Sequence, residues 1–190
     1  MAKRTTMGET IKRLSSPDAA IREAAAAEIY RLGRTLGDSV VDQWRALLDF
    51  AALLAGPPTV GLAVQAGTFE RIRAANGSPR LADVPPDLDA MEFELHFAGA
   101  SLDILTSRAP GGGGAIARYL EKFGEGIQQV EYTSSDVGRA TEILRARLGL
   151  QPLYPKARAG ADGTRINFFL ASNPEGKKVL IELVETPARG

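Results

Sequence analysis

The chain has 190 residues, of which 44% are hydrophobic and 24% are charged. This length suits one domain, or one domain with a small appendage, and the apolar fraction is typical of globular rather than disordered chains. Basic and acidic residues number 23 each, so the net charge is zero and gives no general attraction to nucleic acid or anionic membranes. The absence of cysteine excludes disulfides and thiolate chemistry, and a single histidine, His96, excludes metal motifs with two histidines.

Membrane insertion and secretion are not indicated by the sequence. No segment approaches the roughly 18 to 20 uninterrupted apolar residues that a membrane-spanning helix needs. Residues 1–6 lead into a polar helix rather than into the apolar core of a signal peptide. We therefore expect a cytoplasmic protein that binds neither nucleic acid nor a membrane.

The first quarter of the chain is predicted to form two amphipathic helices. Residues 16–18 (Ser-Pro-Asp) are a start signal, because serine can cap a helix, proline suits its first turn and aspartate complements its dipole. Apolar residues then recur at helical spacing as far as Gly33, which can end the helix. A second helix is expected to begin at Asp38 and to end at residues 56–58 (Gly-Pro-Pro).

Two such helices joined by a short turn would form a helical hairpin over residues 1–56. A hairpin cannot bury its apolar face alone, so it must lie on the rest of the chain or on a protein partner. Residues 16–55 are the candidate surface for such a partner. We interpret Trp44 as core packing between the helices and the rest of the fold, with an interface role as the alternative.

After Pro58 the apolar pattern changes from helical spacing to alternation, which is typical of strands. We predict strands over 59–64, 91–97, 102–106, 127–132, 152–157, 165–170 and 179–184. Helices are predicted over 115–122 and 136–148. The second half of the chain thus has the order β-α-β-β-β, and residues 59–106 look like the same unit with its helix shortened or lost.

These patterns predict an α+β fold of two βαβββ-type modules that form one curved, mostly antiparallel sheet. The first module covers 57–107 and is degenerate, and the second covers 115–187. The glycines at 111–114 are interpreted as the joint between them, because they lack the Lys-Ser/Thr pair of a phosphate-binding P-loop. The chain would then consist of the helical extension 1–56 and a domain over 57–187.

Side-chain alternation predicts a polar face in the second module. Val130 and Tyr132 can pack under a helix, so Gln129 and Glu131 point the other way. On the last predicted strand, Glu182 shares this direction. Polar side chains that converge in this way are costly to bury unless they pair with each other, with water, with a metal or with a ligand.

His96 is a second candidate feature. A hairpin turn centred on Gly99 and Ala100 would place it opposite Asp103, with both side chains on one face. A histidine beside an aspartate is the arrangement of an oriented general base. The alternative is a half-exposed structural histidine.

Within residues 115–185, three segments read AIARYLEKFGEGIQQVEYTSSD, RARLGLQPLYPKARAGADGTRINFFL and KKVLIELVE. They strongly resemble the methylmalonyl-CoA epimerases, which belong to the vicinal oxygen chelate superfamily together with glyoxalase I and dihydroxybiphenyl dioxygenase. PTVGLAV at 58–64 resembles the first strand of that family, and SLDILTSRAP at 101–110 resembles the fourth. The resemblance does not extend to the N-terminal helices.

The resemblance implies a divalent-metal site with one ligand from each of four strands, where the family typically uses two histidines with glutamate or glutamine. By position these places are Thr59, Asp103, Gln129 and Glu182, so both histidine positions are replaced. We predict Asp103, Gln129 and Glu182 as the metal ligands. Such oxygen donors favour magnesium, manganese or calcium over zinc, with cobalt as a further candidate. A hydrogen-bonded polar cluster without metal is the alternative.

For activity, the resemblance implies removal of the proton alpha to a thioester and its return on the other face. This reaction needs two acid/base groups and donors for the enolate oxygen. Glu182 corresponds to the family's acid/base residue. Glu131, Glu94 and Asp103 are candidates for the second group, and we predict Glu182, Glu131 and Asp103 as catalytic residues. The substrate would be an acyl-CoA or a related small carboxylic acid, and the enzyme an isomerase or lyase.

Two other functions stay open at this point. A metal-free small-molecule-binding protein of the same fold would keep the pocket and lose the chemistry. An accessory subunit would dock on a larger enzyme through residues 16–55. Because superfamily members commonly pair their modules between chains, we also expect a homodimer.

Overall fold

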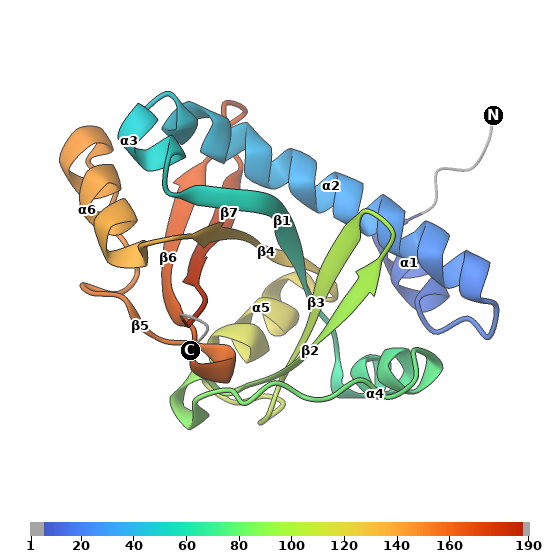
Figure 1. The fold of residues 1–190 in the computed structure, drawn as a ribbon. Coiled ribbons are helices and arrows are strands. Elements are labelled where there is room, and N and C mark those ends of the chain that lie inside the picture. Colours follow the sequence, from blue (N-terminus) through green and yellow to red (C-terminus); the bar gives the residue numbers. More distant parts are fainter. Residues whose placement is uncertain (1–5, 188–190) are drawn as a thin grey trace. The chain divides into compact units, whose positions relative to one another are not determined.

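A computed structural model describes residues 6–187, whose helices and strands form an α+β fold, as predicted (Figure 1). In chain order the elements are α1 (Met7–Arg13), α2 (Ala19–Arg45), α3 (Leu48–Ala51), β1 (Leu54–Ala63), α4 (Ala66–Ala75), the 3-10 turn η1 (Pro86–Leu88), β2 (Ala90–Phe97), β3 (Ala100–Ser107), α5 (Ala115–Phe123), β4 (Gly126–Ser134), α6 (Val137–Leu148), β5 (Arg158–Ala159), the 3-10 turn η2 (Ala161–Gly163), β6 (Arg165–Ser172) and β7 (Lys178–Glu185). The seven strands follow the order β2-β3-β1-β4-β7-β6-β5 in one sheet of mixed direction. None of the helices in the described part is long and apolar enough to cross a membrane.

The chain divides into two compact units, each with its own core. Unit 1 contains residues up to 32 together with 60–128, and unit 2 contains 33–59 together with the residues from 129 onward. The helix α2 and the strands β1 and β4 each contribute residues to both units. The boundary at residue 56 between a helical extension and a second domain stays a prediction.

In unit 1, one side of a three-strand segment is covered by helices. The strand β3 pairs antiparallel with β2 and parallel with β1, where Leu62 is the partner of Ile104. Alternate residues of these strands are apolar, and they pack with α1, α4 and the first part of α2 into one core. This core includes Ile11, Leu14, Ile29, Val60, Leu62, Phe69, Ile72, Phe93, Leu102 and Ile104.

The first module has kept its helix, contrary to our expectation that this helix was shortened or lost. The helix α4 buries Phe69 and Ile72, and the rings of Phe69 and Phe93 lie 4.8 Å apart. Only a few apolar residues of α4 recur at helical spacing, and the side chain of Gln65 does not cap the start of the helix. The sequence pattern was therefore too weak to identify the helix, which tertiary packing stabilises.

In unit 2, β7 pairs parallel with β4 and antiparallel with β6. The helix α6 covers one side of these strands, and it has the ends that the sequence predicts. The side chain of Asp136 accepts a hydrogen bond from the Arg139 amide at the first turn, and Gly149 adopts a left-handed conformation after the last turn. The core contains Val40, Val41, Trp44, Phe50, Val130, Tyr132, Val137, Ile143, Leu144, Phe169, Ile181 and Leu183.

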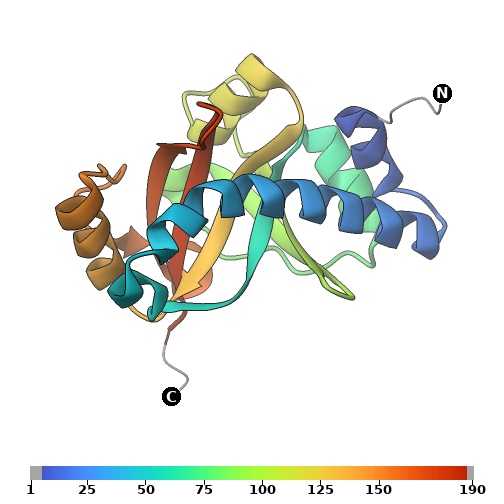
Figure 2. The same cartoon turned by 90° about the horizontal axis from the view of Figure 1, so that it is seen from above.

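The predicted helical hairpin is wrong, because α2 is one continuous helix from Ala19 to Arg45 (Figure 2). Neither Gly33 nor Gly37 has the positive φ that ends a helix, although each costs about 1 kcal/mol relative to alanine within a helix. Packing along the whole helix offsets this cost, since apolar residues of α2 contribute to the cores of both units. The apolar face that we considered for a protein partner is therefore used within the chain.

Gly37 is required by close packing in unit 2. A Cβ atom at this position would lie 2.6 Å from the Tyr132 hydroxyl oxygen and 2.6 Å from Cγ1 of Val130. We expect Gly37→Ala to lower the free energy of unfolding by about 1–3 kcal/mol, because the helix and β4 would have to move apart. Urea denaturation followed by circular dichroism measures this change.

The matched control is Gly67→Ala in α4, where the nearest group to an added Cβ is the Arg71 side chain at 3.4 Å. This variant should be neutral or more stable by up to about 1 kcal/mol, since alanine is the better helix former. Equal losses of stability in both variants would contradict the role of close packing at Gly37.

The predicted strand over 152–157 is also wrong, and β5 contains only Arg158 and Ala159. Prolines at 152 and 155 lack the amide hydrogen of a ladder. The side chain of Asn167 takes over this role: its Oδ1 accepts from the Tyr154 amide at 3.3 Å, and its Nδ2 donates to the Tyr154 carbonyl at 3.1 Å. The segment is thus held beside β6 without being a strand.

Candidate functional site

The strands of unit 2 have a packed face and a polar face, as the alternation predicts. Val130, Tyr132, Ile181 and Leu183 are buried in the core. The residues between them point to the other side. We call this second side the carboxylate face, and it is formed by Gln129, Glu131, Phe168, Leu170, Leu180 and Glu182.

The strand register places two carboxylates side by side on this face. Glu131 of β4 and Glu182 of β7 are Cα partners, and Phe168 of β6 is the partner of Glu182 on its other side. In the next row, Leu170 is the partner of Leu180. The carboxylate pair is therefore bordered by apolar side chains, of which Leu170 is 55% exposed.

The central interaction of this face joins Gln129 and Glu182. The Gln129 side-chain nitrogen donates a hydrogen bond to Oε2 of Glu182. Both residues are buried, with 7% and 6% of their surfaces exposed, respectively. A carboxylate in a site that excludes most water is suited to take up and return a proton. Glu131 beside it is half-buried.

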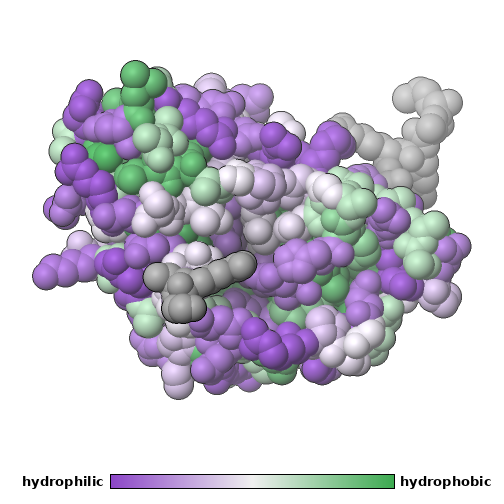
Figure 3. Space-filling model, viewed as in Figure 1, coloured by the Kyte–Doolittle hydropathy of each residue, from purple (hydrophilic) through white to green (hydrophobic). Residues whose placement is uncertain are grey.

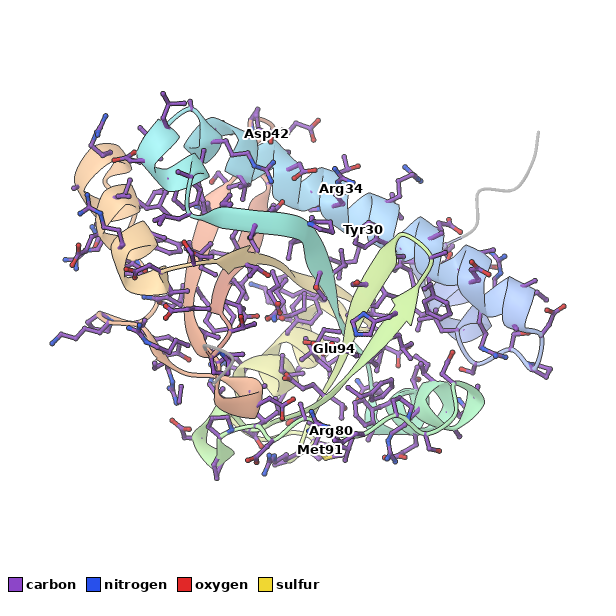
Figure 4. All side chains as sticks on the ribbon, in the orientation of Figure 1. Tyr30, Arg34, Asp42, Arg80, Met91 and Glu94 are labelled. Carbon is purple, nitrogen blue, oxygen red and sulfur yellow. The ribbon has the colours of Figure 1, made fainter. Side chains whose placement is uncertain are left out.

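Unit 1 holds a second acidic group. Asp103 is 6% exposed, and its Cα partners are Gly61 on β1 and Glu94 on β2. Glu94, which is labelled in Figure 4, is exposed. Its Oε2 lies 2.8 Å from Nε2 of His96. The hairpin thus presents acidic side chains and one imidazole on a single face.

The predicted pairing of His96 with Asp103 is wrong by two residues. Phe97 pairs with Ala100, which leaves Ala98 and Gly99 as the turn and places His96 opposite Ser101. The His96 Nδ1 atom lies 3.4 Å from the hydroxyl oxygen of Ser101. The register differs from the predicted one by two residues, and side chains alternate with a period of two. His96 therefore stays on the expected face of the hairpin.

The predicted site residues therefore fall into two groups. Unit 2 brings Gln129, Glu131 and Glu182 together, whereas Asp103 lies in unit 1 beside Glu94. Thr59 is half-buried on β1. The sequence did not identify Phe168 as the neighbour of Glu182. Alternation over 165–170 gives the face of Phe168, but only the register of β6 against β7 places it there.

The residues of unit 2 do not fit a preformed metal centre. Within residues 6–187, no three or more His, Cys, Asp or Glu side chains form a group that could hold a metal ion. The amide nitrogen of Gln129, and not its oxygen, faces Glu182 and donates to it. An amide nitrogen is not a metal ligand. The ligand set Asp103, Gln129 and Glu182 stays a sequence prediction, and no step below passes through a metal.

The strand that carries Gln129 and Glu131 is anchored on its packed side to α2. The Tyr132 hydroxyl donates to Oδ1 of Asp38 at 3.0 Å, and Asp38 also accepts from Arg34 and Arg45 at 3.1 and 3.2 Å. Arg45 further pairs with Asp42, and the sticks in Figure 4 show Arg34 and Asp42 on α2. Burial, together with the charge and hydrogen bond of Asp38, raises the pKa of Tyr132 well above its ordinary value.

This shift predicts a loss of stability at alkaline pH. The folded protein keeps the Tyr132 phenol neutral, whereas the unfolded chain ionises it near a pH of about 10. The stabilisation is therefore fully present below that pH and is lost as the pH rises above it. We expect the free energy of unfolding of wild type to fall more steeply than that of Tyr132→Phe between about pH 9 and about pH 11.

Urea denaturation at several alkaline pH values tests this prediction. The control is Tyr154→Phe, which removes a phenol that lies outside the Asp38 network. Parallel slopes for wild type and Tyr132→Phe would contradict the argument. A steeper slope that Tyr132→Phe alone reduces would support it.

Comparison with known proteins gives matches among solved structures. No protein-family model and no curated protein sequence matches the chain. It is similar to methylmalonyl-CoA epimerase from Mycobacterium tuberculosis, with 30% identity, a TM-score of 0.58, and coverage of 71% of this chain and 90% of that one. A variant of the Streptomyces coelicolor methylmalonyl-CoA epimerase in complex with 2-nitronate-propionyl-CoA matches with 26% identity, 71% and 96% coverage and a TM-score of 0.57.

A further match is a methylmalonyl-CoA epimerase in complex with methylmalonyl-CoA and NH4+, with 25% identity, 72% and 95% coverage and a TM-score of 0.55. A hypothetical protein from Bacillus halodurans shares the fold at 18% identity, with 70% and 94% coverage and a TM-score of 0.57. These similarities confirm the expected vicinal oxygen chelate fold.

Proposed function

The chain belongs to the methylmalonyl-CoA epimerase family, and we propose that it moves the proton alpha to the carbonyl of an acyl-CoA or a related small carboxylic acid. The observation that carries this proposal is the buried carboxylate of Glu182, held by Gln129 and lying beside Glu131. In this proposal the chain is an isomerase of the glyoxalase-like superfamily and works as a homodimer in the cytoplasm.

Glu182 is the group that removes the alpha proton in this proposal. Its side chain is held by the hydrogen bond from the Gln129 amide, which orients the carboxylate. A glutamine amide nitrogen carries two hydrogens, and the one not given to Glu182 is the proposed donor to the enolate oxygen. Glu131 and Asp103 are the proposed alternatives for the group that returns the proton.

Deuterium incorporation into an acyl-CoA tests the activity. Purified protein is incubated with methylmalonyl-CoA in deuterated buffer, and exchange at the alpha carbon is followed by proton NMR. We expect catalysed exchange, and the same assay after chelation and after addition of divalent cations tests the predicted metal ligands. A loss of exchange after chelation that magnesium, manganese, cobalt or calcium restores would support a metal site.

A metal-free binding protein is the second candidate function. The mutual hydrogen bond of Gln129 and Glu182 favours it, because the pair satisfies part of its own polar requirement without substrate. Tight calorimetric binding of methylmalonyl-CoA without any alpha-proton exchange would select this function and reject the isomerase.

A further inference from the structure

The strand β2 lies at one edge of the sheet, and the place on its outer side is open. In the second half of the chain, β4 pairs parallel with β7, β7 pairs antiparallel with β6, and β6 pairs antiparallel with β5. The first half repeats this order only through β1, β3 and β2. Within residues 6–187, no strand takes the place beside β2 that β5 takes beside β6.

The hairpin register determines which backbone groups of β2 face this open side. Phe97 pairs with Ala100 across a two-residue turn, so Phe97 and every second residue before it direct their hydrogen bonds toward β3. The residues between them, at 92, 94 and 96, direct their N–H and C=O groups outward. The Glu92 carbonyl agrees with this direction, because it accepts a hydrogen bond from the Ala82 amide at 3.0 Å.

Beyond Glu92, the outer side of β2 has free backbone groups. In the part of the chain that the structure describes, no hydrogen bond reaches the outward backbone groups of Glu94 or His96. The side chains of these two residues are 62% and 66% exposed, and Leu95 between them is buried in the core. An edge of this kind is a template on which another strand can pair.

Charge complementarity identifies a second copy of the chain as that strand. If two copies of β2 pair antiparallel about a two-fold axis at Leu95, Glu94 of each copy lies opposite His96 of the other. Both residues direct their backbone groups outward, so each facing pair can exchange hydrogen bonds in both directions. An axis at Glu94 would instead place two carboxylates opposite each other, which is unfavourable.

We propose that the chain forms a homodimer in which β2 pairs antiparallel with β2 of a second copy, centred on Leu95. The inference rests on the proposed function only for the expectation of a homodimer, and it does not depend on the alpha-proton chemistry. It assigns Glu94 and His96 as the residues that select the register of the two strands. A pairing over so few residues suits reversible association.

Charge reversal tests this register by sedimentation velocity over a range of protein concentrations. Wild type should form dimers as the concentration rises. Glu94→Lys places a cation opposite His96, and His96→Glu places a carboxylate opposite Glu94, so each variant should raise the dissociation constant by about 10-fold or more. The double variant that combines both changes should return to within about 3-fold of wild type, because the facing pairs again carry opposite charges.

An equal mixture of the two single variants provides a second readout. Each mixed dimer has one lysine facing a glutamate and one pair as in wild type, so the mixture should associate more tightly than either variant alone. Glu142→Lys on α6 is the matched control, since it reverses the charge of an exposed glutamate away from β2. It should leave the dissociation constant within about 2-fold of wild type, and circular dichroism verifies that every variant is folded.

The outcomes separate this inference from the proposed function. Weakening by the single changes and recovery in the double variant and the mixture would support the interface, and it would stand even if deuterium exchange were absent and the isomerase rejected. A dimer that the single changes do not weaken, or that the double variant and the mixture do not restore, would reject the interface and keep the homodimer. Wild type that is monomeric at every concentration would reject both.

Discussion

Replacing Glu182 with glutamine should lower the rate of alpha-proton exchange by about 100- to 10,000-fold. Glutamine has nearly the same shape as glutamate and can still accept a hydrogen bond from Gln129, so the site should keep its geometry. It cannot accept the substrate proton. The rate constant of deuterium incorporation under saturating methylmalonyl-CoA measures the effect, and calorimetry verifies that the thioester still binds.

The control for this prediction is Glu142→Gln on α6, an exposed glutamate whose nearest ion-pair partner is Arg139 at 3.6 Å. It should exchange deuterium at the wild-type rate, since exposed ion pairs contribute little to stability. If Glu182→Gln retains exchange within about 10-fold of wild type, the proton is removed by another group. Glu131 would then be the first residue to examine, because it is the direct neighbour of Glu182.

The second acid/base group can be identified with a single stereoisomer of methylmalonyl-CoA. A variant that lacks only this group should still wash deuterium into the starting isomer through Glu182 but should fail to form the other isomer. Glu131→Gln and Asp103→Asn are the two variants to compare. The variant that shows washout without epimerisation identifies the residue that returns the proton.

The carboxylate face was predictable because it depends on local alternation. Val130 and Tyr132 are apolar residues two apart, which determined the direction of Gln129 and Glu131 before any pairing was known. The direction of the Glu182 side chain followed from the same alternation on β7. What could not be predicted was which residues lie beside these positions. The neighbour Phe168 depends on the register of β6 against β7, and a sequence pattern gives no register.

The incorrect predictions have a common physical cause, which is long-range packing that overrides local signals. Gly33 and Gly37 are weak helix formers, yet α2 continues through both because it packs along its length. The turn at Ala98 and Gly99 shifted the hairpin register by two residues, which an alternating pattern cannot detect. Along 152–157, the Asn167 side chain substitutes for the strand ladder that the apolar pattern indicated.

Replacing Trp44 with alanine should lower the free energy of unfolding by about 3–5 kcal/mol. Trp44 is 3% exposed, and its ring meets those of Phe50 and Phe169 edge to face at 5.9 and 5.7 Å. Truncation would leave a cavity that rigid strands and helices cannot fill. Trp44 is the only tryptophan, so circular dichroism must replace tryptophan fluorescence in the urea titration.

Leu48→Ala provides the contrast in the same unit. Leu48 is 82% exposed on α3, where hydrophobic side chains gather on the surface (Figure 3), so its truncation should change stability by less than about 0.5 kcal/mol. Trp44→Phe should lie between the two, because it keeps an aromatic ring against Phe169. Equal effects of Trp44→Ala and Leu48→Ala would contradict the buried position of Trp44. A large difference would show that this tryptophan supports, from the packed side, the strand whose Phe168 borders Glu182.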